Sequence, residues 1–204
     1  MHKKSEGTPV QITGMLGTVF EAVRDYIYTV DQPSFEGKDF THAQSVLGAA
    51  DRFGLTHMKL LAESEMVSHI LRKDNAAAFI LFADAHSCAL LKEAAFDVYK
   101  NDPMSVRKSD SWNMLKESPK LLDELLEYTS CDRQSTDESG KEIIATLRVA
   151  ELRDRIEQIT PDEKDWPEAV DGTRECLIRK VKEHMEKEEK KNETDDGNDE
   201  EEEE

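Results

Sequence analysis

The sequence lacks any apolar run that approaches the roughly 20 residues needed to span a bilayer. It also lacks a signal-peptide core, because Met1 to Lys4 is followed by polar residues. Its three cysteines are widely spaced and include no CxxC pair, so the sequence predicts neither a disulfide framework nor a zinc site. These absences predict a soluble protein of a reducing compartment, nuclear and/or cytoplasmic, with no membrane partner.

The short motifs of common catalytic sites are missing as well. The sequence contains no GxGxxG, no GxxxxGK followed by Ser or Thr, no GxSxG and no HExxH, which are the minimum parts of dinucleotide, phosphate-loop, hydrolase and zincin sites. His86 and Cys88 lie close together, but residues two apart on a helix point in different directions. A core or capping role is therefore favoured over a nucleophile pair. We predict no enzyme activity, no cofactor and no catalytic residue.

Acidic pairs and histidines give no sign of a metal or acid-base site. Glu63 with Glu65, and Asp84 with Glu93, are expected by chance in a chain this acidic. We interpret them as parts of solvated helix faces. The histidines are spread over different helical faces and show no ligand spacing. The sequence therefore predicts no metal site.

Charge is unevenly distributed along the chain. The sequence has 45 acidic and 27 basic residues, which gives a formal net charge of −18. Residues 192–204 contain nine acidic residues and no basic one, so half of the net charge lies there. This composition predicts a disordered acidic tail over residues 189–204.

Helical spacing of apolar residues dominates the rest of the chain. It recurs in the segments 19–27, 43–53, 58–70, 77–83, 90–98, 112–115, 120–127, 143–157 and 172–188. Alternation at Val10 and Ile12 predicts a single short strand before the first helix. A run rich in Ser, Thr, Asp and Glu predicts a linker over residues 130–142. The predicted fold class is mainly α, with one strand.

The first third of the chain carries motifs of a known family. Val19-Phe20 and Tyr26-Ile27-Tyr28-Thr29 precede Leu47-Gly48-Ala49-Ala50-Asp51-Arg52-Phe53-Gly54-Leu55 and Met58-Lys59-Leu60-Leu61-Ala62-Glu63. In this order and at these spacings, the motifs resemble the second half of a BTB domain, also called POZ, over residues 8–70. In that family the first motifs lie on the helix after the last main strand, and the Ala-Ala-Asp-Arg-Phe-Gly-Leu run bridges two later helices. The resemblance implies a partial BTB fold, an α/β remnant with one strand.

The next segment, residues 71–129, contains Asn75-Ala76-Ala77, Leu81 to Cys88, Leu91-Lys92, Ala94-Ala95-Phe96 and Ser111-Trp112. These motifs resemble the BACK-type helical extension that follows BTB in speckle-type and plant BTB proteins. A complete BTB domain has an earlier half with a dimerising first helix and most of its sheet, whereas this chain starts just before the last strand. We expect a truncated BTB domain, and the family's homodimer is therefore in doubt.

Residues 143–188 carry a further pattern, with Val149, Leu152-Arg153 and Ile156 in a first helix and Gly172-Thr173-Arg174, Leu177-Ile178, Arg179 and Val181 in a second. This pattern resembles a SAP motif, a helix-loop-helix module that binds DNA and sometimes RNA. Fifteen residues separate Ile156 from Gly172, more than is usual in the family. The resemblance implies contacts to nucleic acid through Arg148, Arg153, Gly172, Thr173, Arg174 and Arg179. The alternative is a helical hairpin whose basic residues pair with its own acids, which are Glu151, Asp154, Glu157 and Glu175.

Together these resemblances imply a substrate adaptor of a cullin-RING ubiquitin ligase, tethered to nucleic acid by the SAP-like motif. The implied partners are a cullin scaffold and ubiquitination substrates, with DNA or RNA as a further partner. The implied protein-interaction residues are Phe20, Tyr26, Tyr28, Arg52, Phe53 and Met58. One alternative makes the apolar residues of this region only the core of a helical fragment. Another makes the chain a DNA- or RNA-binding protein with a structural BTB remnant, although the net charge of −18 opposes that binding at long range.

Overall fold

The computed structural model describes residues 14–29, 35, 40–130, 144, 147–162 and 165–195. These residues are mostly helical and contain no strand, which confirms the prediction of a mainly α fold. The strand predicted at Val10 and Ile12 lies outside the described residues. Across the described ranges, no helix combines the length and the apolar composition that crossing a membrane requires.

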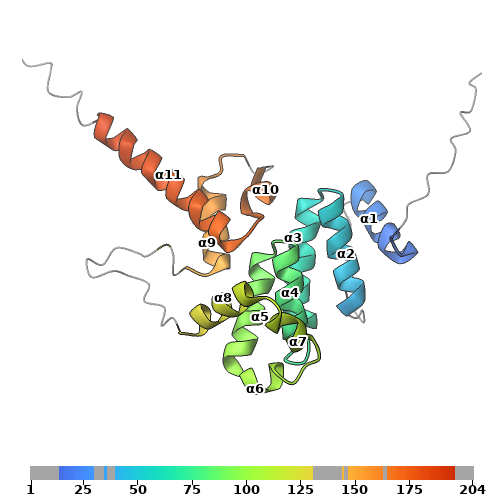
Figure 1. Cartoon of the computed structure of the whole chain (residues 1–204). Coiled ribbons are helices and arrows are strands. Elements are labelled where there is room, and N and C mark those ends of the chain that lie inside the picture. Colours follow the sequence, from blue (N-terminus) through green and yellow to red (C-terminus); the bar gives the residue numbers. More distant parts are fainter. Residues whose placement is uncertain are drawn as a thin grey trace, which may run out of the picture.

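The helices form a bundle with a smaller group beside it. They are α1 (Gly17–Thr29), α2 (Phe40–Arg52), α3 (Thr56–Glu65), the π-helical turn η1 (Met66–Ile70), α4 (Ala76–Ala85), α5 (Ala89–Asn101), α6 (Pro103–Val106), α7 (Ser111–Lys116), α8 (Pro119–Ser130), α9 (Val149–Ile159), α10 (Trp166–Val170) and α11 (Arg174–Asp195). Helix α1 lies on the outer side of α2, whereas α9 to α11 lie on the opposite side of the bundle, next to α3 and α5 (Figure 1).

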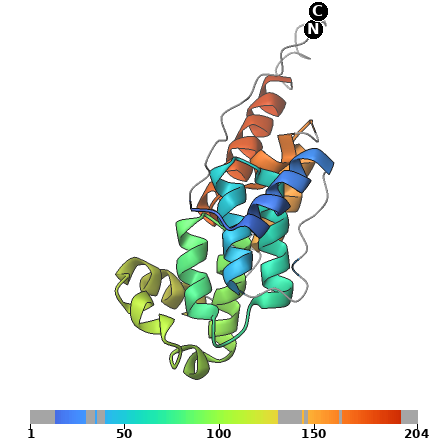
Figure 2. The same cartoon turned by 90° about the vertical axis from the view of Figure 1, so that its right-hand side faces the viewer.

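The turn between α2 and α3 depends on Gly54. Its φ of +65° is a left-handed conformation that glycine adopts without steric cost. The Leu55 N–H donates to the Ala50 carbonyl at 2.8 Å and closes the end of α2. The two helices therefore pack side by side, with α1 in front of them in Figure 2. The sequence predicts this helix stop.

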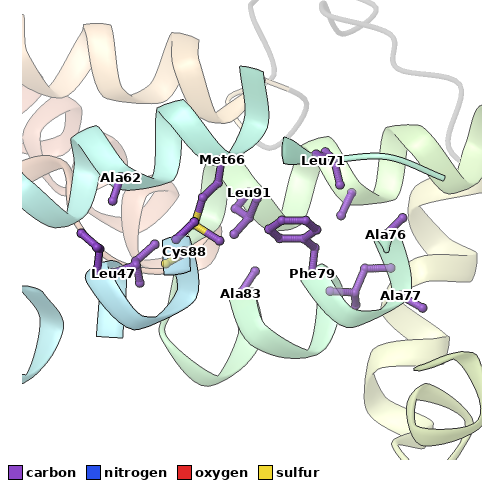
Figure 3. Close-up of a cluster of buried hydrophobic side chains, with 14 of the residues drawn as sticks. Leu47, Ala62, Met66, Leu71, Ala76, Ala77, Phe79, Ala83, Cys88 and Leu91 are labelled. Carbon is purple, nitrogen blue, oxygen red and sulfur yellow. The ribbon is translucent and has the colours of Figure 1, made fainter. Parts of the chain in front are cut away.

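The main core lies between α2, η1, α4 and α5. Figure 3 shows Leu47, Met66, Phe79 and Leu91 converging from these four elements, and all four side chains are fully buried. Phe40 packs edge-to-face on Phe79, with ring centroids 4.5 Å apart. Small buried alanines on α2 and α4 allow close packing of neighbouring helices; they are Ala43, Ala49, Ala50, Ala76, Ala77 and Ala83.

Helices α9, α10 and α11, named here the C-terminal unit, have a small core of their own. It is formed by Val149, Leu152, Ile156, Val170, Leu177 and Val181. This core meets the bundle at Ala89, with Leu60 and Leu90 packed partly buried against it. The unit is therefore internally packed and also docked on the bundle.

The boundaries of the C-terminal helices differ from the prediction. The helix predicted from residue 143 begins at Val149, because the Arg148 N–H donates to the Glu151 carboxylate at 2.6 Å and caps it there. The predicted loop 159–171 contains α10, in whose first turn Pro167 suits a helix start. Helix α11 continues past residue 188 to Asp195, since Glu and Lys are good helix formers.

Candidate functional site

Helix α1 presents apolar side chains on two adjoining faces. Val19 and Val23 are buried against the bundle, whereas Phe20 and Ile27 of α1 are exposed by 41% and 55%, and Leu16, immediately before the helix, by 59%. At about 100° per residue, Phe20 and Ile27 lie about 20° apart around the helix axis. The buried stripe therefore continues into an exposed apolar stripe.

The C-terminal end of α1 contacts the start of α3 through Tyr26. The Tyr26 hydroxyl and the His57 Nδ1 form a hydrogen bond of 2.7 Å that joins the C-terminal end of α1 to the start of α3. In the α2–α3 turn the Phe53 ring is 43% exposed, and the Arg52 guanidinium lies 5.8 Å from its centre. We name the exposed residues Leu16, Phe20, Ile27, Tyr28 and Phe53 the α1 surface. By the same spacing Tyr28 lies about 80° around the helix from Phe20, so the α1 surface is a set of exposed apolar side chains on and beside α1 and in the α2–α3 turn. Exposed apolar side chains that gather in one region of a surface mark interaction sites.

The predicted protein-interaction residues fall into two groups. Phe20, Tyr28, Arg52 and Phe53 are exposed, and the Tyr28 side chain is 82% exposed. Tyr26 is half-buried and burial raises the pKa of its hydroxyl, while Met58 is fully buried in the main core. Sequence reasoning missed Leu16 and Ile27 as surface residues, although helical spacing from Phe20 places Ile27 on the same face.

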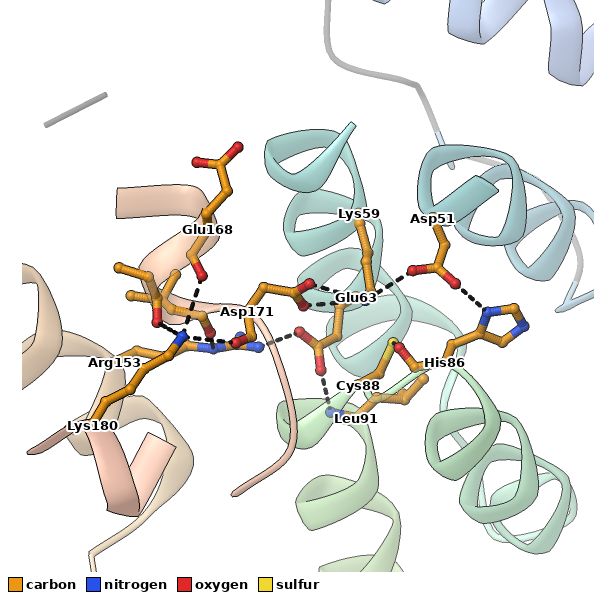
Figure 4. Close-up of polar contacts among 12 residues, drawn as sticks. Asp51, Lys59, Glu63, His86, Cys88, Leu91, Arg153, Glu168, Asp171 and Lys180 are labelled. Atoms are coloured by element: carbon orange, nitrogen blue, oxygen red, sulfur yellow. Dashed lines mark hydrogen bonds and ion pairs between the residues drawn. The ribbon is translucent and has the colours of Figure 1, made fainter. Parts of the chain in front are cut away.

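A second polar site lies between the bundle and the C-terminal unit. The Glu63 carboxylate is 1% exposed; it accepts from the Leu91 N–H at 3.0 Å and pairs with Arg153 at 2.7 Å (Figure 4). The Glu93 carboxylate, 5% exposed, accepts from the Val149 N–H at 2.9 Å at the start of α9. The interpretation of these two glutamates as parts of solvated faces is therefore wrong.

Lys59 carries a buried ammonium group between two carboxylates. Its Nζ lies 3.0 Å from Asp51 and 3.2 Å from Asp171, and His86 holds Asp51 from the other side at 3.0 Å (Figure 4). Burial alone would lower the pKa of Lys59, but the two carboxylates outweigh it and raise that pKa. Burial would likewise raise the pKa of Asp51, but hydrogen bonds from His86 and Lys59 lower it. Asp171 thus ties the C-terminal unit to α3.

Because its pKa is lowered in the folded chain, Asp51 stabilises the fold at neutral pH. We expect Asp51→Asn to melt below the parent chain at pH 7. The difference in melting temperature between the two chains should have its full value above about pH 4, the unfolded pKa of aspartate. It should shrink as the pH falls through the lower pKa of Asp51 in the folded chain. Thermal melts followed by circular dichroism test this. Asp123→Asn, on the exposed side of α8, is the control; a difference independent of pH would contradict the pairing.

Three of the arginines predicted to contact nucleic acid form contacts within the protein itself. Arg153 pairs with Glu63, Arg148 pairs with Asp97, and Arg174 donates to the Leu147 carbonyl at 2.9 Å. Hydrogen bonding to Asp97 raises the pKa of Arg148. Two of the three guanidinium groups therefore pair with acids of the bundle, not with acids of their own helix pair.

The other predicted contacts lie at the start of α11. Gly172 has a φ of +120° and lies beside Cys88 in an isolated parallel bridge. Thr173 is exposed and its hydroxyl accepts from the Cys176 N–H at 3.4 Å. The Arg179 side chain is 69% exposed, with Glu183 one turn on at 3.8 Å. Gly172, Thr173 and Arg179 are thus close in sequence, with Gly172 against the bundle and Arg179 facing solvent.

Cys88 is placed to be unreactive. Its side chain is buried, and burial, followed by the nearby Glu63 carboxylate, raises the pKa of the thiol far above its usual value. We expect iodoacetamide to leave Cys88 unmodified in the native chain while the half-buried Cys176 reacts. Peptide mass spectrometry reads out both, and both should react in urea. Equal labelling rates in the native chain would contradict the packing. Within the described residues, no three His, Cys, Asp or Glu side chains gather as metal ligands.

Comparison with known proteins shows which of them the chain resembles. No protein-family model matches the chain. It is 35% identical over 107 residues to TD and POZ domain-containing protein 2 of Mus musculus, covering 52% of this chain and 29% of that protein. It is 32% identical over 123 residues to mouse TD and POZ domain-containing protein 1, covering 60% and 33%.

A plant protein shows the same likeness. BTB/POZ and MATH domain-containing protein 4 of Arabidopsis thaliana is 28% identical over 150 residues, covering 67% of this chain and 32% of that protein. The chain thus spans about a third of the length of the curated relatives it matches. Over half or more of its length, the chain is therefore similar to BTB/POZ domain-containing proteins.

Proposed function

We propose that this chain is a protein-interaction module of the adaptor kind, and that the α1 surface is its partner-binding face. The observation that carries the proposal is the exposed apolar stripe of Phe20 and Ile27, which adjoins a buried stripe on the same helix and is preceded by the exposed Leu16. Similarity to BTB/POZ proteins supports an interaction role, since the relatives are named for their domains and not for a reaction.

The chemistry of the α1 surface suits a protein partner. Aromatic and arginine side chains dominate the binding energy of protein interfaces, and Phe20, Tyr28, Phe53 and Arg52 are all exposed here. A partner that covers them would remove their apolar area from water, at about 25 cal/mol per Å². We propose a cullin scaffold as this partner and ubiquitination substrates as further partners, following the resemblance to BTB adaptors.

Titration of the full chain with a purified cullin scaffold tests the proposal. The parent chain should bind, and Phe20→Ala combined with Tyr28→Ala should weaken binding at least about tenfold, because both rings lose their contact area. Met104→Ala removes an exposed apolar side chain from α6 (66% exposed) and should leave affinity unchanged. No binding by the parent chain, or equal binding by the double variant, would contradict the proposal.

The domain division belongs to the same proposal. We assign residues 8–70 to a partial BTB domain, 71–129 to a BACK-like extension and 143–188 to a SAP-like unit. The contacts of Arg153 with Glu63 and of Asp171 with Lys59 join the last assignment to the first. Deletion variants ending at residue 129 test whether the bundle folds without the C-terminal unit.

Nucleic-acid binding is the second candidate function, and one observation favours it. Arg179, in the second turn of α11, has a side chain that is 69% exposed, and Thr173, just before the helix, is also exposed. If it contacts a phosphate, Arg179→Ala should reduce the salt slope of duplex DNA binding by about one unit. Fluorescence anisotropy of a labelled duplex against salt concentration measures this. An unchanged slope, or no binding by the parent chain, removes this candidate.

A further inference from the structure

The contact between the bundle and the C-terminal unit has few apolar residues and several charged ones. On the apolar side, Ala89 is buried in the small core, and Leu60 and Leu90 pack against it. The remaining apolar residues of that core belong mainly to α9, α10 and α11 themselves. The unit therefore does not depend on the bundle for most of its own packing.

Carboxylates of the bundle hold the first helix of the unit at three points. Glu63 of α3 pairs with Arg153 at 2.7 Å. Glu93 of α5 accepts from the first N–H of α9 at 2.9 Å, where the partial positive charge of a helix end favours an anion. One turn further along α5, Asp97 pairs with Arg148. A row of acids on α3 and α5 thus faces the basic side of α9.

Asp97 is itself positioned by the bundle. The Tyr128 hydroxyl of α8 donates to it at 2.5 Å. In a fourth contact the bundle supplies the positive charge, because Lys59 of the bundle pairs with Asp171 of the unit at 3.2 Å. Charges of both signs are therefore matched across the boundary, so the unit fits in one orientation. Polar interfaces are typical of two domains of one chain that pack against each other.

We propose that the face of α3 and α5 is a binding surface for an arginine-bearing amphipathic helix, and that the C-terminal unit fills it in cis as a separable cap. The cap covers Leu60 and Leu90 and engages Arg148 and Arg153. A phosphate ligand that needs these two arginines competes with the carboxylates of the bundle. Capping and phosphate binding at these residues therefore exclude each other.

Cutting the connection in the full chain tests the proposal. A protease recognition sequence placed within residues 131–140 allows the folded chain to be cut between the bundle and the unit. After cutting, the helical circular dichroism signal should persist, and the two pieces should sediment together at micromolar concentration and separate on dilution. Loss of the helical signal on cutting, or pieces that do not associate, would overturn the proposal.

Variants of the cut chain identify the contacts. Arg153→Ala should weaken association about 100-fold, because it leaves the buried Glu63 carboxylate without its counter-charge. Arg179→Ala removes the same charge from the exposed side of α11 and should change affinity less than about threefold. Asp97→Asn, half-buried outside both apolar cores, should weaken association about tenfold and leaves both pieces able to fold. Equal affinities for the three variants would overturn the proposal.

Discussion

Replacing Glu63 by alanine should lower the free energy of unfolding by about 3–5 kcal/mol, the usual cost of breaking a buried ion pair from one side. The change removes the acceptor of the Leu91 N–H and leaves the guanidinium of Arg153, 13% exposed, without its carboxylate. Urea unfolding followed by circular dichroism measures the loss.

Glu65→Ala is the matched control for Glu63→Ala. Glu65 lies two residues along in α3, 45% exposed, and its carboxylate is 3.7 Å from the His69 Nε2. Its removal should cost less than about 1 kcal/mol, as is usual for surface pairs. Similar losses in the two variants would show that Glu63 is not buried in a pair as described.

Phe79→Ala should lower the free energy of unfolding by about 3–5 kcal/mol. The Phe79 ring is completely buried in the main core and packs on Phe40 at 4.5 Å, so truncation removes this contact and leaves a cavity. Urea unfolding again provides the measurement. A loss below about 1 kcal/mol would contradict a close-packed core at this position.

Phe53→Ala provides the contrast for Phe79→Ala. Its ring is 43% exposed at the end of α2, so its removal should change stability by less than about 1 kcal/mol. If the α1 surface binds a partner, the same variant should weaken partner binding. The two phenylalanines thus separate packing from recognition.

Local patterns predicted most of the bundle because its helices bury apolar residues at helical spacing. The stop at Gly54 and the start at Pro119 follow from backbone preferences that a sequence shows directly. The start of α9 does not follow from such preferences, because it depends on a cap formed by Arg148 and Glu151 within an otherwise helical pattern.

The charged contacts could not be predicted from local patterns. Glu63 and Arg153 are 90 residues apart in the chain, and neither position is apolar. An isolated glutamate within a helical segment is most often solvated, so its burial becomes visible only when α9 is placed on α3 and α5. The same reason explains why Arg148 and Arg153 resembled phosphate contacts.

The α1 surface was predictable in part. Phe20, Tyr28, Arg52 and Phe53 follow from the family resemblance, and all four are exposed in the structure. Leu16 precedes the quoted motifs and was missed. Met58 carries the same family motif, but its side chain fills the core, because a motif indicates that a residue matters without separating packing from contact.

Hydrogen exchange of the full chain with and without a purified cullin scaffold tests the central claim most directly. Binding at the α1 surface should slow exchange of backbone amides in α1 and in the turn at residues 53–57, and should leave α9 to α11 unchanged. No slowing at α1, or slowing confined to the C-terminal unit, would contradict the α1 surface as the partner-binding face.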